Sequence, residues 1–298
     1  MEKIKLKKVL ILGSTGMLGH VVYSLLNKVP TFKLMDISYK DKLNPSTIIC
    51  DVTNTKKLET IFLTIKPDII INCIGVLIQG TFKSVERAIF LNAYFPHWLK
   101  NICDGIQLSE FKSKLIHFST DQMYNNEKLN DEKNSKIRNF YTSSKIKSEK
   151  LALKIDSIIL RTNFFGKSLT KKRASFSDWI YYSIKNNNKI HLADDIYFSP
   201  ISIDRLIKIV LKILDSNHKG IFNIGSKNGF SKYQFGYLFA KIKYLDSKYI
   251  IKVKKDNLRF LAKRNNDMRM QLNKFEKVFQ IKLPNLINEL KYIAKMYY

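Results

Sequence analysis

The sequence predicts an α/β protein built on a doubly wound parallel sheet with helices on both faces. Three observations support this fold class. Short apolar segments typical of strands alternate with segments of helical periodicity along the first half of the chain. These apolar segments lack the regular polar alternation of a half-exposed sheet, which indicates strands buried on both faces. A glycine-rich turn joins the first strand to the first helix.

That first strand, turn and helix contain the most specific local signal. Residues 9–12 predict a buried strand, and a helical pattern begins at Leu18. Between them, Gly13 permits a sharp turn, Gly16 permits a close approach of the backbone to a pyrophosphate, and Gly19 permits close packing of helix on strand. Free N–H groups and the positive end of the helix dipole would face the phosphates. We therefore expect a dinucleotide site, with an ordinary strand-to-helix turn as the alternative, because the spacing differs from G-x-G-x-x-G.

Composition excludes several classes of protein. With 298 residues, 45% of them hydrophobic, the chain can bury a core in one large domain or in two lobes. The formal net charge of +27 is spread along the chain rather than gathered in one stripe, so we expect anionic ligands but no nucleic acid. The longest apolar run, 69–78, is too short to span a bilayer, and we expect no membrane association and no secretory signal. Three cysteines without metal-like spacing fit a reducing cytoplasm.

Several later segments place polar residues at predicted strand ends. A buried strand at 69–71 is followed by Asn72, Cys73 and Gly75, and the strand at 114–118 is followed by Ser119, Thr120 and Asp121. Ligands of open α/β sheets bind outside the carboxyl ends of the strands, so these residues should share one edge with the glycine turn. His117, inside its strand, is expected to be packed rather than to bind a ligand.

Cofactor preference stays open in the sequence. Asp36, in a second strand near residues 32–37, would accept hydrogen bonds from the adenosine ribose and favour NAD. Lys40 stands close to the same strand end and would instead suit a 2′-phosphate. A solvated loop aspartate is the alternative for Asp36.

Tyr141 and Lys145 carry the predicted chemistry. They are four residues apart at the start of a predicted helix that runs to about residue 154, so they share one helix face. A nearby ammonium lowers a tyrosine pKa, and such a tyrosine exchanges a proton with a carbonyl or alcohol near neutral pH. The hydroxyl of Thr120 would hold the substrate oxygen. Since tyrosine and lysine are abundant here, a surface pair is the alternative for this spacing alone.

Taken in order, the motifs resemble the extended short-chain dehydrogenase/reductase family, over most of the chain and most strongly over residues 9–166. They are the glycine turn, Asp51, 72–75, Asn92, 119–121, Tyr141-x-x-x-Lys145 and 161–166. Three segments are similar to the dTDP-4-dehydrorhamnose reductase branch of sugar-nucleotide enzymes: 67–68 (PD), 117–121 (HFSTD) and 199–204 (SPISID).

The resemblance implies a Rossmann NAD(P)-binding domain over residues 1–166. A smaller substrate-binding lobe would occupy 167–298, with a segment near 188–226 returning to the sheet. It implies a cytoplasmic reductase that uses NADPH or NADH on a nucleotide-linked 4-keto-6-deoxy sugar, in surface-polysaccharide or deoxysugar biosynthesis. A homodimer is one option for the oligomeric state. A nucleotide-sugar epimerase or dehydratase, or a non-catalytic cofactor-binding protein on this fold, are the alternatives.

The resemblance also assigns roles to individual residues. The expected catalytic residues are Thr120, Tyr141 and Lys145. The expected cofactor contacts are Gly13, Gly16, Met17, Leu18 and Gly19 (pyrophosphate), Asp36, Asp51 and Val52 (adenosine), Cys73, Ile74 and Gly75 (ribose side), Asn92, Tyr141, Lys145 and Thr162. The expected substrate contacts are Thr120, Asp121, Tyr141 and Asn163. Phosphate contacts from Lys172, Arg173, Arg264 and Arg269 are weaker candidates, each with a solvated surface charge as its alternative.

Two departures from the family narrow the prediction. The dehydratases have an acidic residue after Thr-Asp, whereas this chain has Gln122, which favours reduction without dehydration. Some rhamnose reductases bridge a dimer through a metal held by glutamates, one of them soon after the glycine turn. Here His20 follows Gly19, so no such metal is expected.

In the C-terminal part, Trp179 and Tyr182 lie on an apolar stripe that predicts a core position.

Overall fold

The structure is a computed structural model that describes residues 6–77, 84–104, 112–125, 129–137, 139–153, 156–170, 174–260 and 265–298. The chain forms two compact units. The first contains residues 1–119, 143–160 and 207–221, and the second contains residues 120–142, 161–206 and 222–298. Several strands and helices begin in one unit and end in the other.

A seven-stranded sheet forms the centre of the first unit, in the order β11-β6-β5-β4-β1-β2-β3. Its strands are β1 (Lys7–Leu12), β2 (Phe32–Ser38), β3 (Ile48–Ile49), β4 (Ile69–Asn72), β5 (Lys114–Thr120), β6 (Ser157–Thr162) and β11 (Gly220–Ile224). The pairs β1–β2, β2–β3, β1–β4 and β4–β5 are parallel. The strand order reverses between β1 and β4, which is the topological switch point of a doubly wound sheet.

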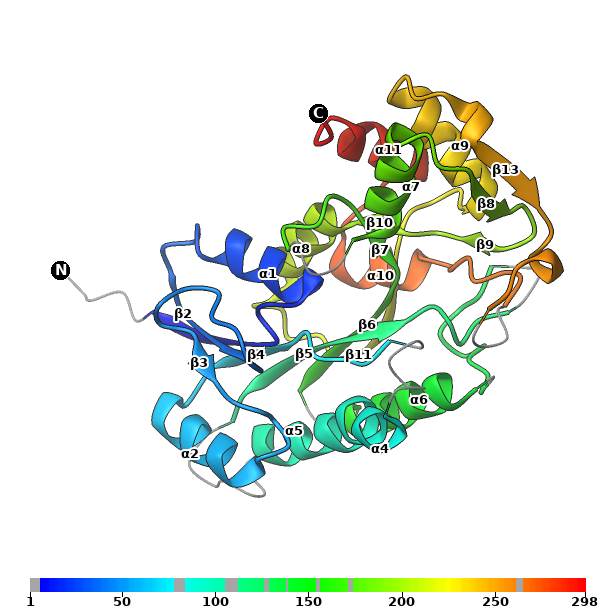
Figure 1. The fold of residues 1–298 in the computed structure, drawn as a ribbon. Helices are drawn as coiled ribbons and strands as arrows, with labels where there is room; N and C mark the ends of the chain where they lie inside the picture. The colour runs from blue at the N-terminus through cyan, green and yellow to red at the C-terminus, as the bar shows by residue number, and fades with distance from the viewer. Residues whose placement is uncertain are drawn as a thin grey trace. The chain divides into compact units, whose positions relative to one another are not determined.

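Helices cover both faces of this sheet (Figure 1). One face carries α1 (Met17–Leu26) and α8 (Ile203–Ile213). The other carries α2 (Thr55–Ile65), α4 (Val85–Ile89), α5 (Phe95–Cys103) and α6 (Phe140–Ala152). The predicted fold class is therefore confirmed.

The core of the first unit explains why its strands have no polar alternation. Leu10, Ile70, Leu115 and Ile159 lie in four neighbouring strands, and each is 0% exposed. Burial of one such side chain stabilises the fold by roughly 1.5–3 kcal/mol. A sheet covered on both faces needs apolar residues at consecutive positions, which is the pattern the sequence shows.

The helical segment from Val85 to Cys103 contains an irregular turn. Between α4 and α5, residues Phe90–Tyr94 form a π-helical segment, η1, in which the N–H of Phe95 donates to the carbonyl of Phe90, five residues earlier. Pro96 follows immediately and has no N–H to bond to the carbonyl of Asn92. The helix therefore continues past the proline with a π turn before it, a feature that often marks functional sites.

The second unit consists of short paired strands and helices. Parallel pairs join β7 (Phe164–Phe165) to β10 (Ile201–Ser202) and β8 (Ile190–Ala193) to β13 (Ile250–Val253), and an antiparallel pair joins β9 (Tyr197–Phe198) to β12 (Phe230–Ser231). The α-helices are α7 (Phe176–Lys185), α9 (Lys232–Ile242), α10 (Asn273–Phe279) and α11 (Leu286–Ala294), with short turns η2 (Ser247–Tyr249) and η3 (Lys255–Asn257).

Helix α7 corrects one prediction. Trp179 and Tyr182 were expected in the core, but they are 42% and 48% exposed. The buried face of α7 is instead formed by Ile180, Tyr181 and Ile184. Two apolar stripes run along this helix. In the stripe that contains Tyr181, this ring packs on that of Tyr297, and its hydroxyl donates to the main chain of Tyr298.

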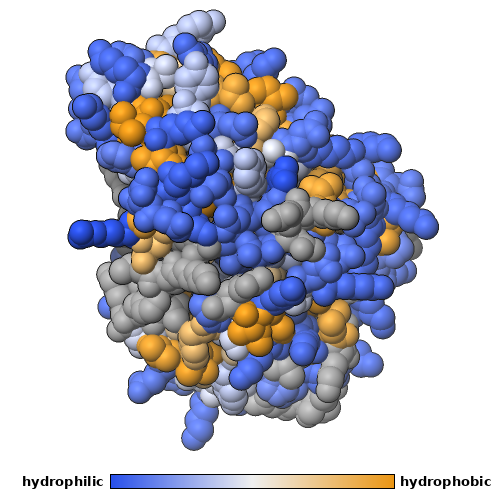
Figure 2. Space-filling view, turned by 90° about the vertical axis from the view of Figure 1, so that its right-hand side faces the viewer, coloured by the Kyte–Doolittle hydropathy of each residue, from blue (hydrophilic) through white to orange (hydrophobic). Residues whose placement is uncertain are grey.

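Hydrophilic residues predominate on the face shown in Figure 2, where hydrophobic residues form separate small areas. Such scattered exposure is ordinary for a protein surface. Among the described residues, every helix is too short or too polar to cross a bilayer.

The glycine turn yields a first prediction. A Cβ at Gly19 would lie 2.2 Å from the carbonyl oxygen of Gly13, so Gly19→Ala should push α1 away from β1 and cost about 1–3 kcal/mol of unfolding free energy. Chemical denaturation measures the loss. Ser24→Ala, on the same helix, is the control and should change stability by less than about 0.5 kcal/mol. Equal effects of the two substitutions would contradict the close approach.

Candidate functional site

The glycine turn lies at the carboxyl end of β1, beside the switch point of the sheet. Gly13 has a φ of +84°, and a Cβ there would lie 2.9 Å from a side-chain carbon of Ile74. Gly16 is the N-cap of α1, and no side chain caps this helix. The first N–H groups of an α-helix have no partner within the helix, so an uncapped start leaves donors for an anion. Met17 and Leu18 are the first two residues of α1. The turn therefore has the conformation and the donors that a pyrophosphate needs.

Asp36 is buried beside this turn, with 1% of its surface exposed. Its carboxylate accepts hydrogen bonds from Ser14 Oγ at 2.5 Å and from Asn44 Nδ2 at 3.3 Å. Ser14 was not predicted, although its hydroxyl stands inside the glycine motif. This pair ties the turn after β1 to β2, so Asp36 has a structural role beside any contact with a ribose.

Asp51, the expected adenine contact, is held by an arginine that the sequence analysis did not identify. Arg87 of α4 binds both oxygens of Asp51, at 3.1 and 3.3 Å. The Arg87 guanidinium also lies 4.6 Å from the centre of the Tyr39 ring, at the end of β2. Burial raises the pKa of Asp51, but hydrogen bonds from Thr53 and Arg87 outweigh it, and the net pKa is lowered. No spacing in the sequence links residues 51 and 87, so only the fold identifies this pair. Val52, next to it, is buried.

Asn92 holds the segment that follows β4. Its side-chain oxygen accepts from the N–H of Val76 at 2.8 Å, and its side-chain nitrogen donates to the carbonyl of Val76 at 2.9 Å. A Cβ at Gly75 would lie 3.5 Å from Asn92 Oδ1 and 3.4 Å from Lys145 Nζ. The π turn η1 thus places the side chain of Asn92 beside Gly75. The ammonium of Lys145 lies beside the same glycine.

Lys145 is a buried ammonium with 5% of its surface exposed. It donates to the carbonyl of Phe118 on β5 at 3.2 Å. Burial lowers its pKa to about 8, while the negative charge of Glu149 acts in the opposite direction. A lysine with such a pKa is charged at neutral pH and loses its proton in mildly alkaline solution.

Behind Lys145, a chain of hydrogen bonds connects β4, β5 and α6. Asn72 Nδ2 lies 3.2 Å from His117 Nδ1, His117 Nε2 lies 3.4 Å from Ser148 Oγ, and Ser148 Oγ donates to the carbonyl of Lys145 at 2.8 Å. Since the Asn72 amide nitrogen donates, His117 must accept at Nδ1 and carry its proton on Nε2. Burial and the charge of Lys145 hold the pKa of His117 well below its usual value. His117 is fully buried, so it is packed as predicted.

In the second unit, Thr120, Asp121 and Asn163 are connected. Thr120 Oγ1 accepts from the N–H of Gln122 at 3.2 Å, so its own proton remains available to a substrate oxygen. Asp121, 1% exposed, accepts from Gln122 Nε2 at 3.1 Å and from Asn163 Nδ2 at 2.9 Å. Burial raises the pKa of Asp121, and these amide hydrogen bonds partly offset it. Asp121 therefore orients both amides.

Tyr141 and Thr162 complete the predicted set. Tyr141 lies in the first turn of α6, one helical turn before Lys145, and is 7% exposed. Thr162 ends β6, and its buried Oγ1 has no hydrogen-bond partner among the described residues. A buried hydroxyl without a partner is costly and is expected where a bound molecule completes the hydrogen bond.

The structure gives little support to the basic residues suggested above as weaker candidates for phosphate contacts. Arg269 is bound to Asp267, with a shortest distance of 2.5 Å between their charged groups. Its guanidinium also lies over the ring of Tyr197. Lys172, Arg173 and Arg264 lie outside the described residues.

The structure thus groups the predicted residues within each unit. In the first unit, the glycine turn lies beside Ile74. Beyond β4, the side chains of Asn92 and Lys145 both lie beside Gly75. Cys73 links the two groups along the chain. In the second unit, Thr120, Asp121 and Asn163 form one connected set. Asp51 stands apart with Arg87.

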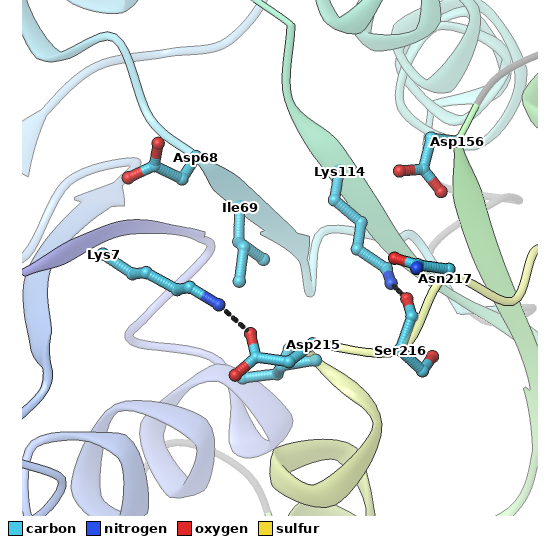
Figure 3. Close-up of a pocket in the computed structure, with 9 residues that line it drawn as sticks. Lys7, Asp68, Ile69, Lys114, Asp156, Asp215, Ser216 and Asn217 are labelled. Carbon is cyan, nitrogen blue, oxygen red and sulfur yellow. Dashed lines mark hydrogen bonds and ion pairs between the residues drawn. The ribbon is translucent and has the colours of Figure 1, made fainter.

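A cavity of roughly 190 Å³ lies at the opposite, amino-terminal edge of the sheet (Figure 3). Lys7 of β1 reaches Asp215 at 2.5 Å, and Lys114 of β5 donates to the carbonyl of Ser216. None of the predicted site residues lines this cavity. Since both lysines already bind the loop after α8, the cavity is a packing feature of this edge rather than a catalytic site.

The part of the chain that the structure describes gathers no three His, Cys, Asp or Glu side chains in a way that would hold a metal ion. The residue after Gly19 is His20, whose pKa is lowered by burial.

A doubly wound sheet with a glycine turn at its switch point and a Tyr-x-x-x-Lys helix defines a protein of the extended short-chain dehydrogenase/reductase class. More specifically, the chain belongs to the family described as "RmlD substrate binding domain", whose model matches residues 7–298. The predicted resemblance is thereby confirmed. No curated protein sequence matches the chain.

Solved structures share the fold over nearly the whole chain. A dTDP-4-dehydrorhamnose reductase from Clostridium acetobutylicum is 20% identical, with a TM-score of 0.84, and the match covers 97% of this chain and 99% of that one. The dTDP-4-dehydrorhamnose reductase of Bacillus anthracis in complex with NADP is also 20% identical, with a TM-score of 0.84 and coverage of 98% and 100%. A dTDP-glucose 4,6-dehydratase of the same organism, in complex with NAD, is 15% identical, with a TM-score of 0.79 and coverage of 98% and 96%.

The buried His117 predicts a pH dependence of stability. Its folded pKa lies well below the unfolded value of 6.5, so below pH 6.5 the unfolded chain binds a proton that the folded chain does not. The free energy of unfolding should therefore fall, by up to about 1.4 kcal/mol per pH unit from this residue, as the pH drops from 6.5 to 5. Denaturation of wild type and His117→Gln at several pH values measures the difference in slope. The control variant His191→Gln, at an exposed position, should keep the wild-type slope, and an unchanged slope in His117→Gln would refute the assignment.

Proposed function

We propose that this protein is an NAD(P)H-dependent reductase of a nucleotide-linked 4-keto-6-deoxy sugar. The observation that carries the proposal is the buried ammonium of Lys145, one helical turn after Tyr141, beside Gly75 and Asn92 at the carboxyl edge of the sheet. Family membership supports it, as do the printed names of the similar structures, two of which are dTDP-4-dehydrorhamnose reductases.

The residues present fit a bound dinucleotide. The uncapped start of α1 leaves N–H donors for the pyrophosphate, and the orphaned hydroxyl of Thr162 suits the nicotinamide end. We propose Asp36, Asp51 and Val52 for the adenosine, and 73–75, Asn92 and Lys145 for the riboses. When bound, the reduced cofactor would supply the hydride that reaches the keto carbon.

We propose that Tyr141 donates the proton to the developing alkoxide. The ammonium of Lys145 would favour the phenolate and so make this transfer easier near neutral pH. Thr120 would donate a hydrogen bond to the same oxygen, since its hydroxyl accepts from Gln122 and keeps a proton to give. Asp121, together with Asn163, would orient the sugar. The larger part of the substrate-binding lobe would come from residues 167–298.

The second candidate function is dehydration of the sugar. Gln122 favours reduction over this reaction. At this position a dehydratase needs a group that gives up a proton. The Gln122 amide instead donates to Asp121 at 3.1 Å and has no acidic proton. We also propose a cytoplasmic setting, which suits the free thiols of Cys50, Cys73 and Cys103.

The decisive experiment is a turnover assay. Purified protein is mixed with dTDP- and other nucleotide-linked 4-keto-6-deoxy sugars and with NADPH or NADH, and the loss of nicotinamide absorbance is followed together with the product. Reduction of the keto group supports the proposal. Tight cofactor binding without turnover of any keto sugar counts against it, and oxidised cofactor that stays bound through purification favours an epimerase or dehydratase.

Loss of the phenol should remove most of the activity. Tyr141→Phe should lower kcat about 10²- to 10⁴-fold, because the developing alkoxide loses its proton donor. Cofactor affinity, measured by calorimetry, should fall far less than kcat, because the other proposed cofactor contacts remain. Tyr182→Phe, at an exposed tyrosine of α7, is the matched control and should keep wild-type kcat. A Tyr141→Phe enzyme with wild-type kcat would exclude this residue as the acid.

A further inference from the structure

A second buried charge lies one turn beyond Lys145 on α6. Glu149 is 1% exposed, and Ser119 Oγ donates to its Oε1 at 2.5 Å. Ser119 belongs to β5 and is itself 8% exposed. A carboxylate buried this deeply costs several kcal/mol unless hydrogen bonds and an opposite charge compensate it. The structure supplies both, because the Lys145 ammonium is buried on the same helix.

The contact surface of β5 and α6 fixes the rotation of the helix. Alternate residues of a strand face the same side, so His117 and Ser119 both face α6. They bond to the consecutive helix residues Ser148 and Glu149. Two anchors at adjacent positions hold the helix against turning about its own axis.

We infer that Glu149, held by the hydroxyl of Ser119, is a positioning residue that keeps the ammonium of Lys145 charged beside Tyr141. This inference rests on the proposed function, since the charge of Lys145 matters for catalysis only if Tyr141 is the proton donor.

The other groups around Lys145 cannot replace this carboxylate. From β5, His117 is neutral, because its pKa lies well below its usual value. Two residues before Gly75 in the chain, the Cys73 thiol is also neutral, because burial raises its pKa. From η1, Asn92 contributes an uncharged amide near Gly75. From α6 itself, Tyr141 is a phenol. Within the described part of the chain, Glu149 is the carboxylate whose charge acts on Lys145.

Two opposing effects, burial and the negative charge of Glu149, set the pKa of Lys145. Burial lowers the pKa of Lys145 to about 8 even with Glu149 present. Removing the negative charge leaves burial unopposed, so the ammonium should lose its proton closer to neutral pH. The resulting neutral amine would no longer favour the Tyr141 phenolate. Glu149 therefore sets the upper pH limit of the working enzyme.

The test is Glu149→Gln, which removes the charge and keeps the shape of the side chain. Full-length protein labelled with [¹³Cε]lysine is titrated by NMR, and the Lys145 signal is identified by its absence in Lys145→Met. The titration midpoint of Lys145 should fall by about one pH unit or more. The pKa of the alkaline limb of kcat/KM should fall by the same amount, with near wild-type activity at pH 6.5 and about a fivefold loss near pH 8.

Two further variants keep the test decisive. Glu86→Gln, at an exposed glutamate of α4, should leave the Lys145 midpoint and the pH profile unchanged. Ser119→Ala keeps the charge of Glu149 but removes the hydrogen bond that holds the carboxylate in place. The carboxylate can then move away from Lys145, so the midpoint should fall in the same direction by a smaller amount. If Glu149→Gln does not fold, Ser119→Ala decides the question.

The outcomes separate this inference from the proposed function. A midpoint unchanged in the folded variants, or an activity loss of equal size at every pH, overturns the positioning role. A lowered midpoint supports it. Absence of keto-sugar turnover by the wild type would defeat the proposed function alone, because the NMR titration needs no substrate.

Discussion

The withdrawal of one ammonium group from water is the constraint around which the first unit is organised. Lys145 is buried, and its neighbours are those that a buried cation requires: a main-chain carbonyl on β5 and a carboxylate one turn along its own helix. These neighbours are themselves held, Glu149 by Ser119 and the Lys145 carbonyl by Ser148. The buried polar groups between α6 and β5 thus compensate the single positive charge of Lys145.

The two edges of the sheet differ in how far their charged side chains are exposed to water. At the amino-terminal edge, Lys7 and Asp215 pair with side chains that are 48% and 63% exposed, where water screens the interaction and it adds little stability. At the carboxyl edge, Lys145 and Glu149 are almost completely buried. Charge pairs at the first edge are replaceable, whereas removal of one partner at the second leaves an uncompensated charge in the interior.

Sequence patterns predicted the fold class and most elements of the first unit, because the short apolar runs of β1, β4 and β5 are typical of strands in a sheet covered on both faces. Ordered motifs also named Asn92, Tyr141 and Lys145 as candidate site residues. They could not identify Glu149 or Arg87, since each acts through a partner brought close by the fold, Ser119 in one case and Asp51 in the other. Periodicity also failed at Trp179, because a helix with two apolar stripes does not reveal which one faces the core.

The five-residue turn at Phe90–Tyr94 has a consequence for the phase of the surrounding helix. An α-helix advances by about 100° per residue, so one additional residue in a turn shifts every later position around the axis by that angle. The faces of α4 and α5 therefore cannot be placed on one helical wheel. Loss of a single residue from this turn would restore the ordinary repeat, rotate Asn92 away from Val76 and release the segment after β4 that Asn92 holds. Chain length at this point, rather than side-chain identity alone, holds the amide in place.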